Sequence, residues 1–360
     1  MIFSILIIFF TLIGLAIIHE FGHFLVAKKF GSDVEEFGIG YPPRIVGKKI
    51  GNTVYSLNLL PFGAFVRIKG EEGGVSIEDS KSMANKPIWQ RALIILGGVI
   101  SFWIIGFILF SVIFSVGAPV NISDADEIDG AEVQIVGIAS ESPAEAAGIK
   151  IGDTIQGIQS SDSEIKDVNR VIDVQEFINA NLGKEIVFSV KRDGEILGVS
   201  LVPRIEAPEG EGAIGVSLTR TAIQKYSLAQ SSIEAVKVCL NLTHSIVIGF
   251  GNALRNAFIG QPTGVEIVGP VGIGSLMSQA MDAGFIYYLQ FVALVSIHLA
   301  VVNLLPIPAV DGGKLLFLGI EKIKGKPLNR KVEGGINAFF FILLIIMMFF
   351  VTIKDVARIF

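Results

Sequence analysis

The chain has 360 residues, of which 51% are hydrophobic and 18% charged, and its mean hydropathy of +0.63 is that of a membrane protein. A single cysteine, Cys239, excludes an intrachain disulfide and a zinc site built from cysteines. The net charge of -5 says little by itself, and its distribution along the chain says more; we expect the lipid bilayer and no nucleic acid among the partners.

The first apolar segment, residues 2–27, contains the sequence His19-Glu20-Phe21-Gly22-His23. On a helix, His19 and His23 lie one turn apart on the same face, so both imidazoles can reach one metal ion. Glu20 is placed to take the proton of a water activated by that metal. Because a glutamate inside a membrane helix is costly without a partner or a function, the pattern favours a hydrolase working inside the bilayer. The segment lacks the basic start and the cleavage site of a signal peptide, so we expect a retained transmembrane helix.

Residues 36–69 are rich in Gly, Pro, aromatic and β-branched residues. Two short strands are predicted, at 53–57 and 64–68, around a turn at Pro61 and Gly63. Such a membrane-associated β-loop could add a strand to an unwound substrate through Ala64, Phe65 and Val66. The alternative is an ordinary cytoplasmic hairpin.

A second apolar helix is predicted at 92–117, and residues 121–220 then form an inserted α+β domain. Its strands and helices follow an order that resembles a PDZ domain, as does the string Ser-Pro-Ala-Glu-Ala-Ala-Gly from residue 142. A helix is expected at about 173–181, followed by strands at 185–192, 196–203 and 213–218. In the last strand, Ile214, Gly215 and Val216 would line a groove for peptide C-termini. The alternative is a domain that only covers the site.

Residues 226–284 are predicted to be an amphipathic helical connector on or near the outer surface. Within it, 238–254 could be a membrane span, but it carries Asn241, His244 and Asn252. Apolar helices at 285–305 and 335–353 complete a polytopic α-helical membrane protein with about four transmembrane helices.

Charge distribution predicts the orientation. Segment 28–91 holds ten Lys/Arg and segment 312–331 holds six, which places both in the cytoplasm by the positive-inside rule. Segment 121–211 has nineteen Asp/Glu against seven Lys/Arg, a net of -12, and fits the extracytoplasmic side. A crossing at 238–254 would put Asp311 on the opposite side from His19 and His23, so we expect none.

Two histidines do not complete a catalytic zinc site, which usually has three protein ligands and water. The strongest third ligand is Asp311, in the sequence Asn303-Leu-Leu-Pro-Ile-Pro-Ala-Val-Asp-Gly-Gly that ends the helix 285–305. Pro306 and Pro308 break the helical hydrogen bonds there and let Asp311 turn inward. Asn303 can offer both a donor and an acceptor to a peptide strand.

The His19–His23 motif, the segment from Asn303 to Gly313 and the inserted PDZ-like domain resemble those of the site-2 protease family. The resemblance covers essentially the whole chain and is strongest to the bacterial regulator-of-sigma-E intramembrane zinc proteases. The resemblance implies Zn²⁺ held by His19, His23 and Asp311, with Glu20 as the catalytic base and Asn303 contacting substrate. Val310 stands where the family often has Leu, and the length leaves room for a single PDZ domain.

The resemblance implies an endopeptidase that cuts within transmembrane segments of single-pass membrane proteins, such as anti-sigma factors or remnant signal peptides. We expect a multi-pass protein of the inner (plasma) membrane with the PDZ domain extracytoplasmic. Two alternatives stay open: a catalytically silent membrane PDZ adaptor and a metal transporter. The intact Glu20 argues against the first, and the scarcity of further ligands argues against the second.

Overall fold

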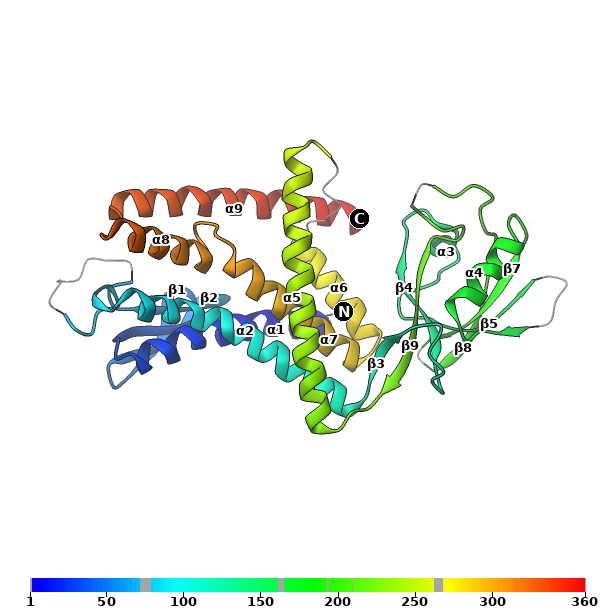
Figure 1. The fold of residues 1–360 in the computed structure, drawn as a ribbon, viewed down its shortest axis with the longest axis horizontal. Helices are drawn as coiled ribbons and strands as arrows, with labels where there is room; N and C mark the ends of the chain where they lie inside the picture. Colours follow the sequence, from blue (N-terminus) through cyan, green and yellow to red (C-terminus); the bar gives the residue numbers. More distant parts are fainter. Residues whose placement is uncertain are drawn as a thin grey trace. The chain divides into compact units, whose positions relative to one another are not determined.

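The computed structural model describes residues 2–71, 79–160, 165–192, 194–208, 210–261 and 268–359 (Figure 1). The chain divides into two compact units. Unit 1 comprises Met1–Ser111, Ser232–Met281 and Tyr288–Phe360, and unit 2 comprises Val112–Ser231 and Asp282–Tyr287. Parts of the predicted PDZ domain (161–164, 193 and 209) and of the predicted connector (262–267) lie outside the described residues.

Unit 1 is built mainly from helices. These are α1 (Ile2–Lys29), α2 (Ile88–Val116), α5 (Leu228–Phe258), α6 (Pro270–Asp282), α7 (Phe285–Leu304), α8 (Asp311–Lys324) and α9 (Arg330–Ile359), with a 3-10 turn at Met83–Asn85; the ends of α2, α5, α6 and α7 belong to unit 2.

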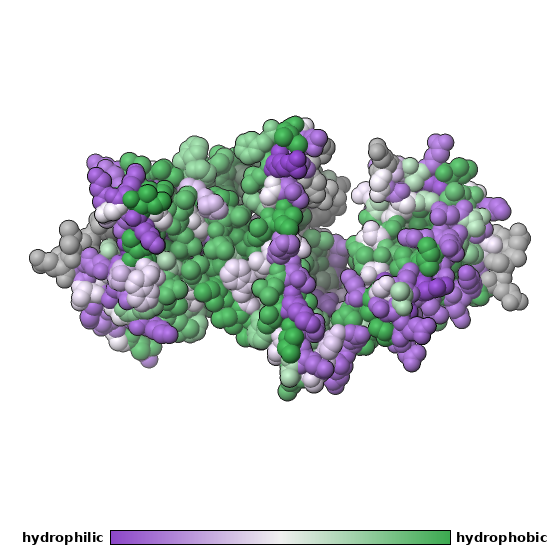
Figure 2. Space-filling view, in the orientation of Figure 1, coloured by the Kyte–Doolittle hydropathy of each residue, from purple (hydrophilic) through white to green (hydrophobic). Residues whose placement is uncertain are grey.

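Five helices are long and apolar enough to cross a membrane, by length and composition. Four of them, α1, α2, α7 and α9, occur where the sequence predicts transmembrane helices. The fifth is α5, which the sequence analysis assigns to the membrane surface. In the face that Figure 2 shows, hydrophobic side chains cover much of the helical unit, and hydrophilic ones gather at its left end and along α5. This distribution is that of a protein whose helices face lipid.

The main chains of α1 and α2 come into direct contact at Gly22 and Gly97. A Cβ atom on Gly22 would lie 2.2 Å from the carbonyl oxygen of Gly97, and one on Gly97 would lie 2.7 Å from that of Gly22. Small residues let membrane helices approach this closely. Further along, Val99 and Phe102 of α2 are buried in a cluster with Leu15 and Ala300 of α1 and α7.

Strands β1 (Val34–Ile50) and β2 (Thr53–Ile68) form an antiparallel sheet in unit 1. Phe37 of β1 pairs with both Tyr55 and Val66 of β2, so residues 36–39 lie between the two halves of β2. The predicted hairpin of 53–57 with 64–68 is therefore wrong, because both segments pair with β1. The register makes 64–68 an outer strand, whose second edge is not used by the sheet within the described residues.

Unit 2 contains a seven-stranded sheet. Its strands are β3 (Ala118–Ile122), β4 (Glu132–Ile138), β5 (Thr154–Ser160), β6 (Lys166–Asp167), β7 (Ile186–Arg192), β8 (Glu195–Leu201) and β9 (Val216–Gln224), in the order β3-β9-β4-β5-β7-β8 with β6 on β5. The short helix α3 (Pro143–Ala146) and α4 (Val171–Ala180) complete it. Val174 and Ile178 of α4 pack with Ile135, Ile155 and Phe188 in one buried cluster, as the amphipathic pattern of that helix requires.

The elements of unit 2 follow the predicted order, with differences at the last strand and at two strands, β3 and β6, that were not predicted. The last strand begins at Val216 instead of 213 and continues to Gln224, because its second half pairs with β3. β3 itself was not predicted from the sequence.

Candidate metal centre

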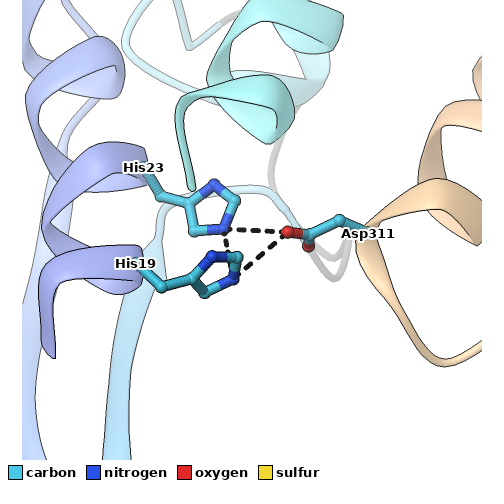
Figure 3. Close-up of side chains that lie close together, drawn as sticks. All are labelled: His19, His23 and Asp311. Carbon is cyan, nitrogen blue, oxygen red and sulfur yellow. Dashed lines mark hydrogen bonds and ion pairs between the residues drawn. The ribbon is translucent and has the colours of Figure 1, made fainter. Parts of the chain in front are cut away.

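Two helices of unit 1 bring three side chains to one point. His19 and His23 lie one turn apart on α1, and their Nε2 atoms are 3.2 Å from each other. Oδ2 of Asp311, the first residue of α8, is 3.2 Å from Nε2 of each histidine (Figure 3). Within the described residues, this is the single group of at least three His, Cys, Asp or Glu side chains with metal-binding geometry, and its ligand atoms all lie within 4.8 Å.

The loop between α7 and α8 positions Asp311, and its backbone packs closely against the start of α8. α7 ends at Leu304 before the two prolines, and Ala309 has φ of 79°, a conformation that residues other than glycine rarely adopt. Its N–H donates to Oδ1 of Asn337 on α9, at 3.2 Å. A Cβ on Gly312 would lie 2.0 Å from the carbonyl oxygen of Leu305, so only glycine lets α8 begin this close to the loop.

The donor set fits a zinc ion. Oδ2 of Asp311 is buried without a hydrogen-bond partner in the described structure, and such an atom is rare unless another ligand satisfies it. Two imidazole nitrogens and one carboxylate oxygen form the His₂-carboxylate set of a catalytic zinc site, with a position left for water.

The imidazoles are oriented by their surroundings. Nδ1 of His23 lies 2.9 Å from the carbonyl oxygen of Ile94 on α2. A carbonyl can only accept, so Nδ1 carries the proton and Nε2 keeps its lone pair for a metal. The ring of His19 stacks on Phe102, with centroids 4.7 Å apart.

Gly98 of α2 closes the site on another side. A Cβ atom there would lie 2.2 Å from Nε2 of His23 and 2.7 Å from Cε1 of His19. The position can therefore hold no side chain while the histidines keep their places.

Glu20 is bound to the sheet. Its Oε2 accepts a hydrogen bond from the backbone N–H of Val66, at 3.0 Å. Val66 belongs to the outer strand segment 64–68, so this N–H points away from β1 and toward α1. The predicted base and the predicted substrate strand are thus in direct contact.

The ammonium group of Lys314 lies next to Asp311. Nζ of Lys314 lies 2.7 Å from Oε1 of Glu71 and 3.8 Å from Oδ1 of Asp311. Burial lowers the pKa of Lys314, but the carboxylates of Glu71 and Asp311 more than offset this effect and raise it above its ordinary value. Lys314 therefore stays charged throughout the neutral range.

The other predicted site residues have defined places. Asn303 lies in the last turn of α7 and donates its side-chain amide to the carbonyl of Leu299, at 2.9 Å. Ala64 is buried, and the ring of Phe65 stacks on Tyr41.

In unit 2, Ile214 is buried in the core and its carbonyl accepts from the N–H of Ala144. The carbonyl of Gly215 accepts from Ala139, and Val216 begins β9 beside Ile138 of β4.

Sequence reasoning missed Gly98, Lys314 and Glu71. The adjacent glycines 97 and 98 in an otherwise bulky apolar helix were a signal of a close approach. The position of Lys314, one helical turn after Asp311, was a signal of a shared helix face. No local pattern points to Glu71.

The sequence profile of Peptidase family M50 matches residues 7–347 of the chain. A candidate zinc metalloprotease of Clostridium acetobutylicum is 34% identical over 343 residues, covering 95% of this chain and 94% of the relative. One of Clostridium perfringens is 32% identical, covering 95% of each chain. The regulator of sigma-W protease RasP of Bacillus subtilis is 28% identical, covering 99% of this chain and 98% of RasP. The chain therefore belongs to peptidase family M50, the site-2 protease family, and is a zinc metalloprotease of the membrane.

Proposed function

We propose that the chain is an intramembrane endopeptidase whose zinc is held by His19, His23 and Asp311. The observation that carries this proposal is the convergence of three metal-binding side chains, one with an unsatisfied buried oxygen, beside helices long and apolar enough to span a bilayer. When bound, zinc supplies Lewis-acid activation of water for attack on a peptide carbonyl.

Glu20 serves as the general base in this proposal. Its neighbours in sequence and space are the metal-binding histidines, and it contributes no atom to the three-ligand group. The carboxylate takes the proton of the attacking water and gives it to the leaving amine. Its hydrogen bond with Val66 fixes the carboxylate during these transfers.

The outer strand segment 64–68 receives the substrate as an added strand. A helical substrate hides its carbonyl groups in its own hydrogen bonds, so the segment to be cut must first be extended. Within the described residues the outer edge at Ala64, Phe65 and Val66 pairs with no further strand, and its Val66 N–H is bound to Glu20, so the edge lies next to the proposed base, which supports this role. Asn303 offers a further polar contact, since the oxygen of its amide is not used in the bond to Leu299.

We further propose that unit 2 is a single PDZ domain of the regulator-of-sigma-E type. Its groove would lie near 214–216, where Val216 remains partly exposed. Groove binding of peptide C-termini, and screening of substrates by size, are the two roles compatible with such a domain. The Bacillus subtilis relative is named a regulator of sigma-W protease, which supports substrates of the anti-sigma type, and remnant signal peptides are the second class.

The proposed location is the inner (plasma) membrane, with unit 2 extracytoplasmic. His19 and His23 lie toward the C-terminal end of α1, and Asp311 follows the C-terminal end of α7. α1 and α7 would thus cross in the same direction, which supports α5 lying along the surface.

The test is cleavage of a reporter with one membrane helix by full-length protein in detergent, with zinc content measured in parallel. Glu20→Gln should retain zinc and lose at least about 10³-fold in activity, because it removes the base and no ligand. Asp311→Ala should lose both. A wild-type protein that holds zinc but cuts no helix in a panel would favour the adaptor or the transporter instead.

A further inference from the structure

The two carboxylate oxygens of Asp311 have different partners. Oδ2 faces the two histidines, at 3.2 Å from each Nε2. Oδ1 faces Nζ of Lys314, at 3.8 Å. A carboxylate held in this way offers one oxygen to a metal and keeps the other engaged, which is the monodentate arrangement of many zinc sites.

Lys314 is itself held from a different element. Its Nζ donates to Oε1 of Glu71 at 2.7 Å, and the side chain of Glu71 is only 22% exposed. Glu71 follows β2, and its backbone N–H donates to the carbonyl of Ile68 at 3.1 Å. The segment that follows the outer strand is thus connected to Asp311 through two successive ion pairs, Glu71–Lys314 and Lys314–Asp311.

The charges explain why both residues are needed. A lone ammonium group beside a zinc site would weaken metal binding by charge repulsion. Glu71 compensates the charge of Lys314, so the pair can orient Asp311 without adding net positive charge to the site.

We propose that Lys314, fixed by Glu71, is a positioning residue that holds Asp311 in its zinc-binding orientation and links the outer strand to the metal. This inference rests on the proposed metal site. Metal affinity is therefore the property that should respond first, ahead of any effect on the chemical step.

The experiment measures zinc affinity of full-length protein in detergent by competition with a chelator. Lys314→Met should weaken zinc binding about 10–100-fold, the usual effect of losing a residue that orients a ligand. Lys314→Arg keeps a charged donor and should restore part of the affinity. Glu71→Gln should also weaken binding, because it leaves Lys314 unfixed and uncompensated.

A matched control lies on the same helix. Glu321 pairs with Arg91 of α2 through two hydrogen bonds, away from the metal ligands. Glu321→Gln should lower the unfolding temperature and leave zinc affinity unchanged. If it weakens zinc binding as much as Lys314→Met does, the effect comes from loosening α8, and the proposal is overturned.

The zinc affinity of the double variant Glu71→Gln/Lys314→Met shows whether the two residues orient Asp311 together or affect zinc binding independently. Coupled residues should give a double variant no weaker in zinc binding than Lys314→Met alone, whereas additive losses contradict the proposal. Asp311→Ala tests the site itself. Loss of zinc in Asp311→Ala with wild-type affinity in Lys314→Met overturns the positioning role only; zinc retained in Asp311→Ala overturns the metal site as well.

Discussion

The absence of a Cβ atom at Gly98 leaves the space that the rings of His19 and His23 occupy. The histidines approach α2 so closely that the Cβ position of residue 98 coincides with the space of their rings. Nδ1 of His23 is at the same time bound to the carbonyl of Ile94, one turn earlier on α2. The ring cannot move away from a new methyl group without losing that hydrogen bond.

Gly98→Ala should therefore weaken zinc binding by roughly tenfold or more, as displaced ligands do. Zinc stoichiometry after dialysis against a chelator measures this. Gly14→Ala is the control, because a Cβ on Gly14 of α1 would meet nothing within 4 Å. Replacing a helical glycine there should stabilise the protein by up to about 1 kcal/mol. Equal zinc loss in both variants would contradict the steric explanation.

Two of the proposed metal ligands, His19 and His23, could be predicted from the sequence, because a fixed helical spacing places them on one face without further information. The sequence could not show what surrounds them. The glycine pair at 97 and 98 and the spacing of Lys314 from Asp311 indicate a close approach and a shared helix face, but the partners of Gly98 and Lys314 come from elements distant in the chain, and no local pattern points to Glu71.

Among the elements, the sheet of β1 and β2 connects most directly to the chemistry. The strand segments 53–57 and 64–68 were recognisable from their β-branched and aromatic residues, but their pairing was not. Local propensity does not record that residues 36–39 lie between them. The outer position of 64–68, on which its role depends, was therefore visible only in the structure.

Val66→Pro tests the contact between this strand and the base. Proline removes the N–H that Glu20 accepts, and that N–H is not part of the pairing with β1. A hydrogen bond to a charged group contributes about 1.5–3 kcal/mol, so kcat/KM should fall about tenfold or more with zinc content unchanged. Val66→Ala keeps the N–H and should retain activity. Equal activity of the two variants would exclude this contact from catalysis.

Glu36 gives the sheet a dependence on pH. This buried carboxylate accepts from Ser56 at 2.6 Å and from Arg44 at 3.1 Å. Burial raises the pKa of Glu36, but these hydrogen bonds outweigh it and lower the pKa below the ordinary value of 4.5. A lowered pKa in the folded state means that the ionised form stabilises the sheet above about pH 4.5, and that this stability is lost as pH falls through the folded-state pKa.

Glu36→Gln should therefore lower the unfolding temperature at pH 7, with a difference from wild type that shrinks as the pH falls below 4.5 and through the lowered pKa of Glu36. Thermal unfolding in detergent over a series of pH values from 7 downward measures the effect. A difference that grows toward low pH would mean that the protonated carboxyl, not the carboxylate, stabilises the sheet.

For the molecule as a whole, the proposed metal centre constrains the directions in which α1 and α7 cross the membrane. Apolar length predicted α1, α2, α7 and α9 within a few residues, because a bilayer imposes it on the sequence. Length alone could not decide α5, whose composition also permits crossing. The contact of Asp311 with His19 and His23 adds the missing constraint, since α1 and α7 must then end on the same side.

Cysteine accessibility tests this arrangement. With Cys239 replaced by serine, Lys150→Cys in unit 2 should react with a membrane-impermeant maleimide in intact cells. Lys322→Cys on α8 should react only after permeabilisation. Labelling of both positions from outside would mean that α5 crosses the membrane.

The contact of Gly22 with Gly97 limits how a substrate can arrive. Beside the histidines, the wall formed by α2 is made of main chain, and main chain has no rotamers with which to open a passage. Separating the two helices would also break the hydrogen bond that orients His23. While α1 and α2 stay in contact, the side of the histidines that faces Gly97 and Gly98 is therefore closed to a polypeptide.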